Sequence, residues 1–291
     1  MERKRECAIG FVGARVRCSE KAPAAFGSGT MARAVYPKDG AALARAVAEL
    51  KGQDFVVLGG ATNVLFPDGT LEKTVVFTTS AKDVTRKGSN VYCCAGARLP
   101  AVVAKCADYA LSGAEQLAGI PGTVGGAIAM NAGAFGREIA ELVVRVDAVT
   151  SDGRVVALGA QELHAGYRHT SVTESGLTVL GAELKLCPSS RREIRDCVAG
   201  YADRRRESQP QGRSLGSVFK RADGVSAGYY IEKAGLKGAT VGGARISERH
   251  ANFILNVGEA TSADFVALAE RARREVKEKF GKELEYEVIF L

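Results

Sequence analysis

Residues 119–127 read Gly119-Ile120-Pro121-Gly122-Thr123-Val124-Gly125-Gly126-Ala127, and Asn131 follows shortly after. Glycines let successive main-chain amides point into one concavity, which binds anionic oxygens without a charged side chain. Thr123 and Asn131 add neutral hydrogen-bonding groups to such a loop. The stretch therefore indicates either a phosphate-binding loop or a tight turn at the edge of a lobe.

A second glycine-rich stretch lies earlier in the chain, at Leu58-Gly59-Gly60-Ala61-Thr62-Asn63-Val64-Leu65. It follows a short buried strand expected at 55–58. Neither stretch has the Gly-Lys-Ser/Thr ending of a P-loop, and neither opens a Rossmann helix with an acidic residue about 20 positions on. Two loops of different type, each with small polar residues, favour a diphosphate-containing cofactor lying between lobes over a pair of ordinary turns.

Hydrophobic spacing around these loops predicts an α+β fold in which strands outnumber helices. The length suggests three lobes, 1–80, 81–189 and 190–291, with the last strand able to return to the first part. The expected helices are 39–50, 99–110, 190–206, 227–234 and 261–280, and the expected strands are 55–58, 73–78, 84–87, 90–95, 142–150, 154–158, 177–186, 241–247, 252–256 and 284–291.

Composition excludes several classes of protein. The net charge is +7, but Lys and Arg are spread along the chain without interleaved aromatic residues, so a nucleic-acid partner is not expected. No apolar run approaches the roughly 20 residues that span a bilayer, and the N-terminus lacks a secretory pattern. We expect a cytoplasmic protein. With only three His and no cluster at ligand spacing, no metal site is expected.

Three polar motifs stand outside the glycine loops: Gly166-Tyr167-Arg168-His169-Thr170, Gly216-Ser217-Val218-Phe219-Lys220 and Leu284-Glu285-Tyr286-Glu287-Val288. Each has an ordinary explanation when taken alone. A lone Arg is usually solvated or ion-paired, and Gly-Ser is usually a turn. Alternation along the last strand places Glu285 and Glu287 on one face, as in any half-exposed strand.

Taken together, the motifs resemble a known family. The segment from Leu58 to Leu65 is similar to a Leu-Gly-Gly-Gly-Ser-Asn-Leu-Leu pattern, with Ala61 and Thr62 as departures. The similarity continues through Gly113-Ala114-Glu115, residues 119–127, Met130-Asn131-Ala132-Gly133-Ala134-Phe135-Gly136 and the three polar motifs. This pattern resembles the UDP-N-acetylenolpyruvoylglucosamine reductase family over roughly residues 26–291. The short connection after Arg168 resembles the shorter subtype, which lacks an extra Tyr-bearing loop.

The resemblance implies a two-lobed FAD-binding module of the vanillyl-alcohol-oxidase-like superfamily, plus a C-terminal α+β substrate-binding lobe. It implies non-covalent FAD, with NADPH as hydride donor, in peptidoglycan synthesis. The cofactor-binding residues that it implies come from the two glycine loops: Gly59, Gly60, Ala61, Thr62, Asn63, Gly119, Ile120, Pro121, Gly122, Thr123, Gly125, Gly126, Ala127 and Asn131.

The same resemblance implies catalytic roles for Arg168, Ser217 and Glu287. NADPH would reduce the flavin, which would then pass a hydride to the enolpyruvyl group of a UDP-sugar. Arg168 would bind the substrate carboxylate as charge develops on it, and Ser217 would donate a proton to C2. We expect Glu287 to be protonated, or to share a proton with the intermediate, with a raised pKa, because a carboxylate beside the substrate carboxylate would repel it. The expected substrate-binding residues are Tyr167, Lys220 and Arg221.

We expect the reductase to be a monomer. Two other interpretations remain open at this point. Another FAD-dependent alcohol or sugar oxidase of the same superfamily would share the glycine loops, but it would have no reason to carry the motifs of Ser217 and Glu287. A catalytically inactive binding protein, or a basic nucleic-acid binder, would bind no flavin.

Overall fold

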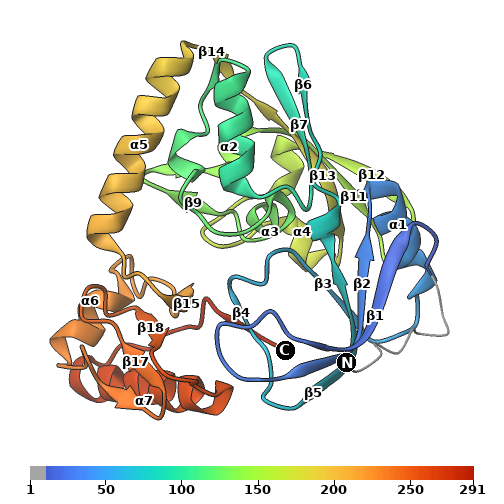
Figure 1. The fold of residues 1–291 in the computed structure, drawn as a ribbon. Coiled ribbons are helices and arrows are strands. Elements are labelled where there is room, and N and C mark those ends of the chain that lie inside the picture. The colour runs from blue at the N-terminus through green and yellow to red at the C-terminus, as the bar shows by residue number, and fades with distance from the viewer. Residues whose placement is uncertain (1–10) are drawn as a thin grey trace. The chain divides into compact units, whose positions relative to one another are not determined.

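The computed structural model describes residues 11–291 (Figure 1). Contacts between residues divide the chain into two compact units. Unit 1 comprises Met1–Ser19, of which 11–19 are described, Arg33–Gly60 and Lys73–Arg204. Unit 2 comprises Glu20–Ala32, Ala61–Glu72 and Arg205–Leu291. The units interleave along the sequence, whereas the three lobes expected from sequence are contiguous, and that three-lobe division stays a prediction.

Unit 1 is built around a five-stranded antiparallel sheet in the order β12-β11-β13-β7-β6. One face of the sheet carries Val91, Val146 and Leu184 and forms the core with two helices. The elements are β6 (Val84–Lys87), β7 (Asn90–Cys94), β11 (Val143–Val149), β12 (Val155–Gly159), β13 (Thr178–Lys185), α2 (Leu99–Asp108) and α3 (Val124–Ala129).

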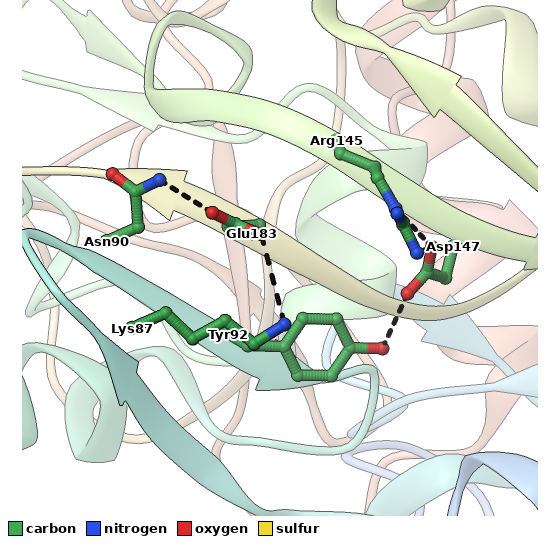
Figure 2. A network of polar contacts seen from close by, with 6 residues as sticks. All are labelled: Lys87, Asn90, Tyr92, Arg145, Asp147 and Glu183. Carbon is green, nitrogen blue, oxygen red and sulfur yellow. Dashed lines mark hydrogen bonds and ion pairs between the residues drawn. The ribbon is translucent and has the colours of Figure 1, made fainter.

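The opposite face of this sheet carries a polar network, formed by residues that alternate along the strands with those of the core. The Tyr92 hydroxyl donates to Asp147 over 3.0 Å, and Arg145 donates to the same carboxylate over 2.7 Å (Figure 2). Asn90 donates to Glu183 over 2.6 Å. Burial, followed by the nearby Asp147 carboxylate, raises the pKa of Tyr92, so this cross-strand network stays uncharged at its tyrosine.

A second sheet has the order β1-β2-β5-β3, with β3 and β5 parallel. Its strands are β1 (Ala14–Lys21), β2 (Thr30–Pro37), β3 (Phe55–Leu58) and β5 (Thr70–Phe77). Helix α1 (Gly40–Glu49) begins after Asp39, whose carboxylate accepts from the Ala42 amide over 2.7 Å. Leu43 and Val47 of α1 pack with Val76 of β5.

Unit 2 contains a four-stranded antiparallel sheet in the order β15-β18-β17-β16. Helix α7 packs against β16 and β17 (Figure 1), and Phe265 of α7 meets Phe26 edge-to-face in the core. The elements are β15 (Arg213–Ser217), α6 (Ala227–Lys233), β16 (Thr240–Val241), β17 (Ala244–Ile246), β18 (Phe253–Asn256), α7 (Ser262–Phe280), β4 (Val64–Leu65) and β19 (Ile289–Phe290).

The helix α5 and several short elements complete the fold. They are η1 (Thr78–Ser80), β8 (Leu111–Ser112), η2 (Glu115–Leu117), β9 (Gly133–Ala134), β10 (Arg137–Glu138), η3 (Ile139–Leu142), η4 (Ala160–Leu163), α4 (Ser171–Glu174), β14 (Cys187–Pro188) and α5 (Arg191–Ser208).

Most expected elements are confirmed, including the helices α5 and α7. A capping box begins each of these two helices, and Gly281 ends α7 at φ +64°. The last strand is wrong as predicted: only Ile289–Phe290 forms a ladder, in parallel with Val64–Leu65. The residues before Ile289 do not extend this ladder. Among them, Tyr286 makes an isolated bridge with Phe219.

Candidate functional site: two glycine segments and three polar motifs

The stretch at 119–127 is only partly a loop. Residues Val124–Ala129 form helix α3, so Gly125, Gly126 and Ala127 are helical rather than loop residues. The Gly125 amide donates to the Ala95 carbonyl over 2.8 Å, and a Cβ on Gly125 would lie 3.0 Å from the Cβ of Ala95. Gly125 therefore serves close packing between helix and chain, whereas Gly126 is exposed.

The two glycine segments approach each other at Gly59 and Thr123, both in unit 1. A Cβ on Gly59 would overlap the hydroxyl oxygen of Thr123. That hydroxyl is buried and has no hydrogen-bond partner within residues 11–291. An unpaired buried hydroxyl costs about 1–3 kcal/mol, and a ligand acceptor reaching it would remove this cost.

Ala61 lies directly after the glycine pair and adopts φ +53°, the left-handed region that favours glycine. The family pattern has glycine at this position, so Ala61 departs from the pattern at a position where a side chain strains the backbone. Asn63 donates its side-chain amide to the carbonyl of Glu287 over 2.8 Å, and its expected contact with the cofactor stays a prediction.

Asn131 is fully buried and uses its side chain within the protein. Its amide nitrogen donates to Glu138 over 2.7 Å and to the Gly166 carbonyl over 3.0 Å. Its oxygen accepts from the Ala140 amide over 3.3 Å. These contacts tie the end of the glycine passage to the turn that carries Arg168. A cofactor contact by Asn131 stays a prediction.

Arg168 sits in a tight turn closed by reciprocal main-chain hydrogen bonds between Gly166 and His169, at 3.0 and 3.2 Å. Its φ is +56°, which strains a residue with a side chain. The guanidinium carbon lies 5.0 Å from the ring centroid of the exposed Tyr167. Both side chains are thus presented by one short turn of unit 1.

Ser217 and Glu287 lie in unit 2, on segments that touch through the main chain. The Glu287 amide donates to the Val218 carbonyl over 2.8 Å. Ser217 ends β15, next to Phe253 of β18, and both Ser217 and Glu287 are half-buried. The structure therefore brings the second and third polar motifs together, and it places Arg168 in the other unit.

The segment of Glu287 is also anchored by its neighbour Tyr286. The Tyr286 ring lies 5.1 Å from that of Phe219, and its hydroxyl donates to Glu270 over 2.8 Å. Burial, followed by the hydrogen bond to the Glu270 carboxylate, raises the pKa of Tyr286. Tyr286 therefore remains a neutral donor at physiological pH.

Asn252 was not among the residues predicted to act at the site. It is 5% exposed, and its side chain pairs with both main-chain groups of Phe219, accepting over 3.0 Å and donating over 2.8 Å. The residues around Asn252 gave no indication of this pairing, because Phe219 lies far away in the sequence.

The expected substrate-binding cations lie beside Ser217. The Lys220 ammonium is 3.4 Å from the Glu285 carboxylate, and both side chains are accessible to solvent. Such a pair contributes little to stability, which leaves the Lys220 ammonium available to an anionic ligand. Arg221 follows at an exposed position. Within residues 11–291, no group of His, Cys, Asp and Glu is arranged to hold a metal ion.

Comparison with known protein families first defines a class. The FAD binding domain family matches residues 31–159, which include both glycine segments. The buried Thr123 hydroxyl, which has no hydrogen-bond partner within residues 11–291, fits a bound group that offers it an acceptor. The chain is therefore an FAD-binding protein. No helix among the residues that the structure describes is long and apolar enough to cross a membrane.

A match to the C-terminal part of the chain, together with relatives that cover most of its length, identifies the particular family. The C-terminal domain family of UDP-N-acetylenolpyruvoylglucosamine reductase matches residues 209–291. UDP-N-acetylenolpyruvoylglucosamine reductase of Streptococcus pneumoniae strain CGSP14 is 38% identical over 261 residues, covering 88% of this chain and 86% of that protein. The enzyme of strain Hungary19A-6 is 38% identical over 260 residues, with the same coverage.

A solved structure agrees with these relatives. The crystal structure of UDP-N-acetylenolpyruvylglucosamine reductase from Thermus caldophilus matches with a TM-score of 0.79 and 33% identity, covering 95% of this chain and 98% of that one. The chain belongs to the UDP-N-acetylenolpyruvoylglucosamine reductase family. The expected fold class, an α+β FAD-binding module with a C-terminal α+β lobe, is confirmed.

Proposed function

We propose that this protein reduces the enolpyruvyl group of UDP-N-acetylglucosamine enolpyruvate to the lactyl group of UDP-N-acetylmuramate, with NADPH as reductant. This is the reaction of peptidoglycan precursor synthesis. Family membership supports it. The structural observation that carries it is the hydrogen bond from the Glu287 amide to Val218, which brings the segments of Ser217 and Glu287 together.

FAD binding falls to the two glycine segments. Thr123 offers a buried hydroxyl without a hydrogen-bond partner within residues 11–291, at the point where its segment approaches Gly59. The other predicted contacts in residues 119–127 and 61–63 are part of this proposal. When bound, FAD supplies the two-electron hydride chemistry that connects NADPH with the sugar.

Arg168 binds the carboxylate of the enolpyruvyl group. A planar guanidinium forms two parallel hydrogen bonds with a carboxylate, and it stabilises the negative charge that spreads there when a hydride reaches C3. The turn from Gly166 to His169 presents Arg168 together with Tyr167. Tyr167, Lys220 and Arg221 complete substrate binding, with the two cations directed at the diphosphate.

Ser217 donates the proton that C2 receives. A serine hydroxyl is a weak acid, so it needs a strongly basic carbon opposite it and a fixed position. Residue 217 has such a position, because it pairs with Phe253 at the end of β15.

Glu287 acts in its protonated form. An ionised carboxylate beside the substrate carboxylate would repel it, whereas a protonated one donates a hydrogen bond to the developing charge. We therefore expect the pKa of Glu287 to be raised when the substrate is bound. The protein acts in the cytoplasm as a monomer.

Anaerobic addition of NADPH to purified protein tests the function. The visible spectrum should show bound flavin that bleaches rapidly with NADPH and recovers when the enolpyruvyl sugar is added. A colourless protein, or a flavin reduced by a sugar alcohol but not by NADPH, would reject the proposal in favour of a binding protein or an oxidase.

A further inference from the structure

Asn63 holds the segment of Glu287 through both its side chain and its main chain. The side-chain amide donates to the Glu287 carbonyl over 2.8 Å, across 224 residues of sequence. The Asn63 carbonyl accepts from the Ile289 amide over 3.0 Å. The adjacent Val64 pairs in parallel with Ile289. The hydrogen bonds of Asn63 therefore fix the register between β4 and the segment from Glu287 to Ile289.

Asn252 makes an equivalent arrangement on the segment of Ser217. Its side chain takes the place of a strand partner for Phe219, accepting from its amide and donating to its carbonyl. The Asn252 carbonyl accepts from the Val218 amide over 2.8 Å. Both side-chain bonds are buried, which makes them costly to lose.

The two arrangements meet at Val218. Its amide is bound by Asn252, and its carbonyl accepts from the Glu287 amide over 2.8 Å. A continuous series of hydrogen bonds thus runs from Asn252 through Val218 and Glu287 to Asn63. All four residues belong to unit 2.

We infer that Asn63 and Asn252 are positioning residues, which fix the main-chain separation of Glu287 and Ser217. This inference rests on the proposed roles of those two side chains. Asparagine suits the task because its amide both donates and accepts without titrating. A misplacement of about 1 Å can cost about 10²-fold in rate, so such residues contribute to catalysis without touching the substrate.

Asn63 thus has a positioning role beside the cofactor contact that the family resemblance implies. A cofactor contact would make Asn63→Ala lose flavin whatever residue occupies position 287. With a positioning role, the loss of enolpyruvyl-reduction rate in Asn63→Ala would depend on whether residue 287 is Glu, because Asn63 would act through Glu287. The two roles are therefore separable by a double-mutant cycle.

The cycle compares Asn63→Ala in the native background with Asn63→Ala in Glu287→Gln. The measurement is the single-turnover rate of enolpyruvyl reduction by protein already reduced with NADPH. We expect a loss of about 10²-fold in the native background and of less than about 3-fold in the Glu287→Gln background. Equal losses in the two backgrounds would overturn the role of Asn63.

Asn256 provides a matched control. Its side-chain amide also donates over 2.8 Å to a distant carbonyl, that of Ala25, within the same unit. Asn256→Ala should lower the rate by the same factor in both backgrounds. For Asn252, the same cycle is run against Ser217→Ala, because removing the proton donor should abolish its effect.

Amide hydrogen exchange tests the arrangement without activity. Asn63→Asp keeps the size of the side chain but removes the donor, and it should speed exchange at Glu287 and Ile289 while α7 stays protected. Unchanged exchange at both amides would overturn the inference. If Glu287→Gln alone kept full activity, the proposed function of Glu287 would fail, and the exchange result would still decide whether Asn63 holds this segment.

Discussion

The main-chain amide of Glu287 donates to the carbonyl of Val218 over 2.8 Å, so a residue near the C-terminus lies beside the residue that follows Ser217. Tyr286 strengthens this contact, because its ring packs on Phe219 at 5.1 Å between centroids. The proposed proton donor and the proposed acid are therefore carried by segments that cannot move independently. The predictions below test the site that this arrangement supports.

Ser217→Ala should separate the two half-reactions. Removing the hydroxyl removes the proton for C2, so enolpyruvyl reduction should fall by about 10²–10⁴-fold while flavin reduction by NADPH continues. Stopped-flow absorbance of the flavin measures both steps. Ser214→Ala, in the same strand, is the control and should change neither. An equal loss in both half-reactions would remove Ser217 from its role.

Arg168→Lys should reduce activity although the charge is kept. An ammonium is a point charge and cannot form the paired hydrogen bonds of a guanidinium with a carboxylate. We expect a fall of about 10²-fold in kcat/KM for the enolpyruvyl sugar. Arg137→Lys, at an accessible ion pair with Glu141, is the matched control. Full activity of Arg168→Lys would argue against carboxylate binding.

Gly59→Ala should destabilise the protein through Thr123. The new Cβ would overlap the Thr123 hydroxyl, at a cost of about 1–3 kcal/mol in the free energy of unfolding. Thr123→Ala should restore part of this loss while weakening FAD binding. Urea denaturation and flavin titration measure the two effects. Gly69→Ala, where no atom lies within 4 Å, should be nearly neutral, and a similar loss there would contradict the explanation.

Ala61→Gly should stabilise the protein. Ala61 adopts φ +53°, where a side chain costs about 1–2 kcal/mol, and glycine returns about 0.5–1 kcal/mol of this as chain entropy. The net gain in the free energy of unfolding should be about 0.5–1 kcal/mol by urea denaturation. Ala127→Gly, within α3, should lower stability instead. A loss of stability in Ala61→Gly would show that the side chain contributes more by packing than it costs in strain.

Local patterns predicted what depends on neighbours in sequence. Asp39 and Thr261 mark helix starts, and Gly281 marks the end of α7, because capping uses main-chain groups within a few residues. The hairpin at Lys87-Gly88 is local in the same way. The family resemblance identified the three polar motifs as candidate site residues. Judged by their neighbours in sequence alone, they look like ordinary turns and strand residues.

Distant pairing was beyond such patterns. Helix α3 was missed because two adjacent glycines argue against a helix, and only the tertiary structure shows the close approach to Ala95 that explains Gly125. The last strand was overextended because alternation along residues 284–288 looks the same whether or not a ladder forms. The cofactor roles expected for Asn63 and Asn131 overlooked bonds to Glu287 and Gly166.

The sequence by itself determined most of the helices and turns, the class of chemistry at the glycine segments, and through resemblance the three side chains proposed to act. Only the tertiary structure decided that Asn63 meets Glu287, that Asn252 meets Phe219, and that the segments of Ser217 and Glu287 share a hydrogen bond at Val218. The reason is physical. A cap or turn is satisfied within a few residues, whereas a side-chain amide can pair with any main-chain group that folding brings within reach.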